Sequence, residues 1–134
     1  MIRESDISIA LGAHLGNMFP LPPIAWPNHK ITPAMPYLFP QVVRGSRTDP
    51  SVAGDFAISN GQYLVTVVSE LNEFTVAAEK LADDVAERFP MGLRLAVTGG
   101  EITIMQPPEI LQGFPDAVSW RVPVRIAYRA LKES

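Results

Sequence analysis

The sequence of 134 residues contains no cysteine, which excludes disulfides, thiolate nucleophiles and every metal site built on cysteine. Charged residues are also scarce, at 19% of the chain against roughly 25% in typical soluble domains. Lys and Arg total 11 and Asp and Glu total 14, so the net charge of -3 creates no strong field for nucleic acid or anionic lipid. No run of about 18 apolar residues occurs, so we expect no membrane-spanning helix. The acidic start lacks a signal-peptide pattern, and we expect a protein made in the cytoplasm.

Proline, in contrast, is abundant, with 13 residues where an average of about 5% would give roughly seven. Seven of them lie in Phe19–Pro40 and three more in Gln106–Ala117. Proline lacks an amide proton and fixes φ, so neither segment can be an interior helix or a central strand. Because many apolar side chains accompany these prolines, we expect stiff connections that lie on the body of the domain.

The hydrophobic share of 47% and the length predict one domain over residues 1–134. Apolar residues recur with the helical period over Asp6–Met18, where Ser5 is the expected N-cap. The same period predicts a second helix over Glu73–Arg88, with Asn72 as its cap and a proline and a glycine after its end.

Strand patterns account for most of the remaining chain. They cover residues 37–44, 61–69, 93–97, 101–105 and 118–129, and Thr98–Gly100 is the expected tight turn between the third and the fourth. In the last strand, Pro123 cannot donate to a ladder, so we expect it on an edge or at a bulge. The element order predicts an α+β fold: a mainly antiparallel (mixed) sheet of about five strands flanked by two helices.

The connection Gly45–Ala57 is long for a hairpin and rich in small and polar residues. Loops of this length are commonly functional or disordered. We therefore consider Arg47, Asp49, Asp55 and Phe56 as candidate contacts to another subunit or another protein.

No pattern of catalytic chemistry appears. His14 lies on an apolar helix stripe and His29 in a turn-like segment, and neither has a neighbouring histidine or carboxylate at metal-ligand spacing. The chain has no Gly-x-Ser-x-Gly elbow and no phosphate-binding loop. We predict no catalytic, cofactor-binding or metal site.

Two charged stripes are the remaining surface candidates. Glu79, Asp83 and Glu87 recur every four residues on the second helix, where a solvated face or paired carboxylates for acid–base work are the alternatives. Arg121, Arg125 and Arg129 lie on one face of the last strand, and we call them the Arg row. The row could protect an edge strand or bind nucleic acid, although aromatic residues are missing from that face. A third interpretation is a head-to-tail contact between the acidic stripe and the Arg row, which can close into a ring.

The whole-chain layout resembles the tail terminator (tail completion) proteins of long-tailed bacteriophages and gene-transfer-agent particles. The resemblance is carried by Ile7 to Gly12, Ala25-Trp26, Ile31 to Pro33, Pro36 to Leu38, Gly61 to Val67, Arg88 to Pro90 and Trp120 to Val124. These segments are structural signatures and cover nearly the whole chain in order.

The resemblance implies a structural virion protein and no enzyme. Such proteins form a hexameric ring on the finished tail tube, stop its polymerisation and offer a surface to the head-completion (stopper) protein, while DNA passes through the lumen without specific binding. It further implies location in the tail or neck of the virion, assembly in the bacterial host cytoplasm, no cofactor and no membrane. The alternatives are another neck or baseplate component, or a small ligand-binding α+β domain.

Overall fold

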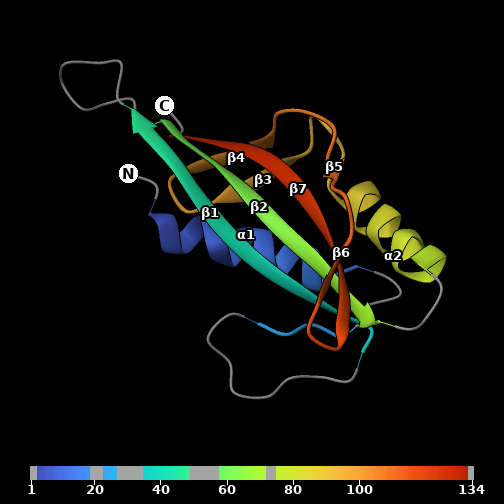
Figure 1. Ribbon diagram of the computed structural model, residues 1–134. Coiled ribbons are helices and arrows are strands. Elements are labelled where there is room, and N and C mark those ends of the chain that lie inside the picture. The colour runs from blue at the N-terminus through green and yellow to red at the C-terminus, as the bar shows by residue number, and fades with distance from the viewer. Residues whose placement is uncertain (1–2, 19–22, 27–34, 49–57, 72–74, 133–134) are drawn as a thin grey trace.

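The computed structural model describes residues 3–18, 23–26, 35–48, 58–71 and 75–132 (Figure 1). In chain order the elements are α1 (Glu4–Gly16), β1 (Tyr37–Thr48), β2 (Ile58–Glu70), α2 (Thr75–Arg88), β3 (Arg94–Val97), β4 (Gly100–Ile104), β5 (Glu109–Ile110), β6 (Phe114–Asp116) and β7 (Ser119–Lys132). The predicted α+β class is confirmed. The sheet has seven strands because β5 and β6 form within Gln106–Ala117, which the prolines had predicted to be a loop.

The strands follow the order β1-β2-β7-β4-β3, and β5 and β6 also pair with β7. Every pair of these strands is antiparallel. The one parallel contact among the described residues is an isolated bridge between Ile24 and Leu38. β7 is therefore the centre of the sheet. β2 runs along one of its edges, and β4, β5 and β6 follow one another along the other.

Of the two positions expected for Pro123, an edge or a bulge, the edge is wrong. Pro123 lies opposite Thr66 in an uninterrupted register with β2. The carbonyl oxygen of Pro123 accepts a hydrogen bond from the amide of Leu111, on the side of β7 that faces away from β2. The nitrogen and the carbonyl of one residue point to the same side of an antiparallel strand, so the Pro123 nitrogen faces away from β2 as well. On that side, the pairing of β5 ends at Ile110 and that of β6 begins at Phe114. The segment between them is one residue longer than the stretch of β7 opposite it. The missing amide proton therefore costs no bond to β2.

Both helices cover the same face of the sheet, behind the strands in Figure 1. Ile7, Leu11 and Leu15 of α1 and Ala78, Ala82 and Val85 of α2 share one buried cluster with Val65 and Val67 of β2 and Val122, Val124 and Ile126 of β7. We call this side the core face and the other side the open face. The open face carries Gln62 and Leu64 of β2 and the Arg row of β7. Val65–Ser69 of β2 are all buried, so this part of the strand is covered on both faces.

Several predicted boundaries shift. α1 begins at Glu4, and its N-cap is Arg3, which makes no side-chain capping bond, so Ser5 lies inside the helix. β1 continues to Thr48 past a register shift between Arg44 and Arg47. The expected loop Gly45–Ala57 is therefore partly strand, and its residues 49–57 lie outside the described residues, as does the expected cap Asn72.

Candidate interaction surfaces

The described residues contain no cluster of three or more His, Asp or Glu side chains that could hold a metal ion. None of the described helices is long and apolar enough to cross a membrane. The remaining candidates are packing contacts, charged surfaces and grooves.

His14 joins the ends of the two helices. Its Nε2 donates to the carbonyl of Arg88 at 2.7 Å, and the Arg88 Nε donates to the carbonyl of His14 at 2.9 Å. The ring of Phe89 meets the imidazole edge-on, with the ring centroids 5.0 Å apart. His29 lies outside the described residues. The role of His14 is thus structural, since it fixes the C-terminal end of α1 to that of α2.

The His14 contact predicts a pH dependence of stability. Burial, with a smaller contribution from the Arg88 charge, lowers the pKa of His14 below its ordinary value of 6.5, against the opposing effect of the hydrogen bond to the Arg88 carbonyl. The unfolded chain therefore takes up a proton more readily than the folded one. We expect His14 to contribute its full share of the free energy of unfolding above pH 6.5. This share should decrease as the pH falls through the lowered pKa.

Urea unfolding between about pH 8 and about pH 5 measures this dependence. The His14→Gln variant keeps a donor but cannot titrate, so its stability should vary less over that range. An identical pH slope in both proteins would show that His14 does not contribute.

The acidic stripe of Glu79, Asp83 and Glu87 is exposed on the outer side of α2. Glu79 and Asp83 border a shallow groove of about 320 Å³, whose other wall includes residues 110–113 and Trp120. The stripe makes no ion pair with the Arg row within the described part of the chain. The two charged stripes belong to opposite sides of the sheet, because α2 packs on the core face and the Arg row lies on the open face.

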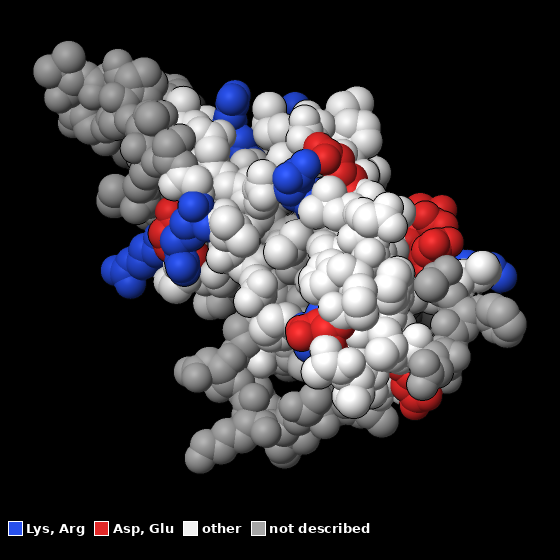
Figure 2. All heavy atoms as spheres, in the orientation of Figure 1, with Lys and Arg blue, Asp and Glu red and all other residues white. Residues whose placement is uncertain are grey.

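Each member of the Arg row has a partner in its own chain. The Arg121 Nε lies 3.1 Å from Asp116 Oδ2, Arg125 pairs with Glu109, and the Arg129 Nε donates to Asn60 Oδ1 at 3.2 Å. Sequence reasoning missed these acids because their segment was assigned to a loop. Oppositely charged side chains lie next to one another on the face that Figure 2 shows, so no patch of a single sign covers it.

The candidates in the long hairpin are only partly placed. Arg47 lies on β1 opposite Ser59, and its side chain is outside the described structure. Asp49, Asp55 and Phe56 lie outside the described residues.

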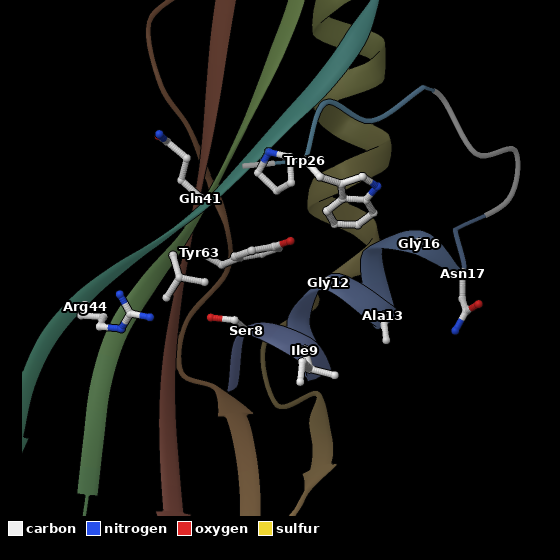
Figure 3. A pocket seen from close by; sticks show the side chains of 12 residues that line it. Ser8, Ile9, Gly12, Ala13, Gly16, Asn17, Trp26, Gln41, Arg44 and Tyr63 are labelled. Carbon is white, nitrogen blue, oxygen red and sulfur yellow. The ribbon is translucent and has the colours of Figure 1, made fainter. Parts of the chain in front are cut away.

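A groove with a volume of about 890 Å³ lies between α1 and β1 (Figure 3). One wall is the outer side of α1, where small residues at Gly12, Ala13 and Gly16 leave room. The Trp26 indole closes one end, and an alanine methyl at Gly12 would lie 3.4 Å from it. The lining comprises Ser8, Ile9, Gly12, Ala13, Gly16, Asn17, Trp26, Pro40, Gln41, Val42, Arg44 and Tyr63. No sequence pattern indicates this groove, because it joins segments from three separate parts of the chain.

Arg44 marks the other end of the groove. Its Nε lies 3.7 Å from Glu4 Oε2, and the second oxygen of Glu4 accepts a bond from the Ser59 hydroxyl at 2.8 Å. Within the described residues this is the one acidic partner of Arg44, whose side chain is 57% exposed. The groove thus combines an apolar lining with one accessible positive charge.

The fold and these surfaces define a small α+β protein with a buried core on one side of a sheet, an open sheet face and an apolar groove. The sequence profile described as "Phage tail terminator protein" matches residues 6–128. The chain therefore belongs to the phage tail terminator family, and it is a structural protein of the virion tail.

Two solved structures share the fold. One carries no functional name; it covers 100% of this chain and 99% of its own, with a TM-score of 0.79 at 24% identity. The other belongs to the virion of a native gene transfer agent (GTA) particle and covers 92% of this chain and 84% of its own, with a TM-score of 0.50 at 16% identity. A comparison with curated proteins found no match.

Proposed function

We propose that this protein forms a ring, as a homo-hexamer, on the end of the completed tail tube. The ring stops addition of tube protein and presents its other side to the head-completion protein, while DNA passes through the lumen without specific binding. The match of the tail terminator family over residues 6–128 carries this proposal. Assembly takes place in the host cytoplasm, and the protein has no enzymatic activity and no cofactor.

Accessible surface for such contacts is present on several elements. Glu79, Asp83 and Glu87 are exposed and make no ion pair among the described residues, so they can meet a partner directly. The Arg row is less available, since a contact there would share or replace its bonds to Asp116, Glu109 and Asn60. The segment 45–57, with Arg47, Asp49, Asp55 and Phe56, stays our proposal for a contact with the tube or a neighbouring subunit.

Tail length tests the capping function. In cells that produce the particle, loss of this protein should give tubes of variable and excessive length without heads, because nothing ends the polymerisation. Electron microscopy measures the tube lengths, and the protein supplied from a plasmid is the control that should restore uniform, head-bearing tails.

Tubes of normal, uniform length in the absence of the protein would contradict the capping function. In that case, labelling the protein in assembled virions would distinguish another position in the neck or the baseplate.

A further inference from the structure

The turn between β6 and β7 forms a braced apolar projection. Val118 at its tip is 74% exposed, and Phe114 and Leu71 beside it are also exposed. The Ser119 hydroxyl donates to the carbonyl of Asp116 at 2.7 Å, and the amide of Leu71 donates to the carbonyl of Val118 at 3.3 Å. These bonds hold the tip in one conformation although it exposes apolar side chains to solvent.

The backbone of this turn is also unfavourable for its sequence. Ala117 has a φ of 56°, which L-residues other than glycine, asparagine and aspartate rarely adopt. Backbone strain of this kind persists where the surrounding structure imposes it, and it is frequent at binding sites. The exposed Val118 and the strained Ala117 together indicate that the tip is shaped for a contact.

The groove between α1 and β1 has the complementary character. It offers the half-exposed Trp26 and the exposed Ile9 as apolar contacts and Arg44 as a positive charge. The tip offers Val118 and Phe114 as apolar contacts and Asp116 as a negative charge. Asp116 uses Oδ2 for its ion pair with Arg121, and its side chain is 56% exposed, so the carboxylate can meet a second cation.

We infer that the β6–β7 tip of one chain inserts into the α1–β1 groove of a second copy of the same chain. Val118 enters beside Ile9 and Trp26, and Asp116 meets Arg44. The two surfaces differ and lie on different strands of one sheet, with β2 between β7 and β1 (Figure 1). Because the tip is tied to its own Leu71, it reaches the groove of a neighbour, and such a heterologous contact can close into a ring. The inference rests on the proposed ring and names its subunit contact.

Because the native chain has no cysteine, crosslinking tests this contact without background. Ile9→Cys and Val118→Cys are made as separate single variants, mixed, allowed to assemble with tube protein into tails, and oxidised. We expect a disulfide-linked dimer of unlike chains as the main crosslinked product. The matched control pairs Ile9→Cys with Val43→Cys, which is exposed and apolar but lies on β1 outside the groove lining, and should give at most a trace of dimer.

The assembly state separates failure of the contact from failure of the function. Native mass spectrometry and electron microscopy of the same samples report whether rings and capped tails are present. Rings without the 9–118 crosslink, or with equal crosslinking of the control pair, would overturn the contact and leave the ring intact. A protein that associates neither with itself nor with tubes would overturn both.

Discussion

Replacing Phe89 by alanine should lower the free energy of unfolding by about 3–5 kcal/mol, which is the range for removing a large buried aromatic side chain. Phe89 is completely buried directly after α2. Its ring packs edge-on to His14 and lies 5.8 Å from Tyr63, measured between ring centroids. It therefore connects α1, the end of α2 and β2, and a cavity at this position would loosen all three.

The loss is large because domains of this size are stable by only about 5–15 kcal/mol. Urea unfolding followed by circular dichroism gives the change in free energy, and the slope with denaturant shows whether unfolding stays two-state. Phe89→Leu is the matched control, since it keeps most of the buried volume and should lose less than the alanine variant. Equal stability of the alanine variant and the native protein would mean that the ring does not hold the helices to the sheet.

Replacing Gly61 by alanine should cost about 1–3 kcal/mol through overpacking. An added Cβ would lie 2.5 Å from the Tyr128 hydroxyl and 2.8 Å from the carbonyl oxygen of Val43. The second of these atoms belongs to the backbone of β1, so β1 or β2 would have to move. Gly16→Ala is the control for the same change of residue, because its Cβ would meet nothing within 4 Å.

Tyr128 supplies a second step to this test. Its buried hydroxyl has no hydrogen-bond partner among the described residues, and burial, with a contribution from the Glu4 charge, raises its pKa to about 12. Tyr128→Phe should therefore change stability by no more than about 1 kcal/mol, since the hydroxyl makes no bond that would be lost.

Combined with Gly61→Ala, Tyr128→Phe should recover part of the loss because it removes the nearest atom. A double-mutant cycle measures this recovery. Strictly additive effects would show that the hydroxyl does not cause the strain at Gly61.

The sequence predicted the elements whose side chains repeat regularly. β2, β7 and α2 are long and strongly patterned, and each forms over nearly the range that the pattern predicted. It failed where a few residues acquire their structure from a neighbour. β5 and β6 exist because β7 offers them an edge, and Pro123 lies in a central strand because its nitrogen faces an interruption in the pairing. The local propensities of these residues indicate neither the two short strands nor the central position of Pro123.

The candidate surfaces show the same division. The two charged stripes could be read from spacing, but the partners of Arg121 and Arg125 could not, because Asp116 and Glu109 are brought there by the pairing of β6 and β5 with β7. The groove was invisible in the sequence, since α1, Trp26 and β1 meet only in the folded chain. The resemblance to the tail terminator family rests instead on the order of segments along the chain, which needs no three-dimensional contact.

The central place of β7 has a consequence for the timing of synthesis. β7 follows every other described element in the chain, yet it separates β1 and β2 from β3 and β4. On the ribosome, no strand pairs with both halves of the sheet until β7 has emerged, so the sheet closes only when translation of this region is almost finished. A chain released early lacks the middle of its sheet rather than one edge, and it would fail to fold. We therefore expect incomplete copies to be excluded from the tail.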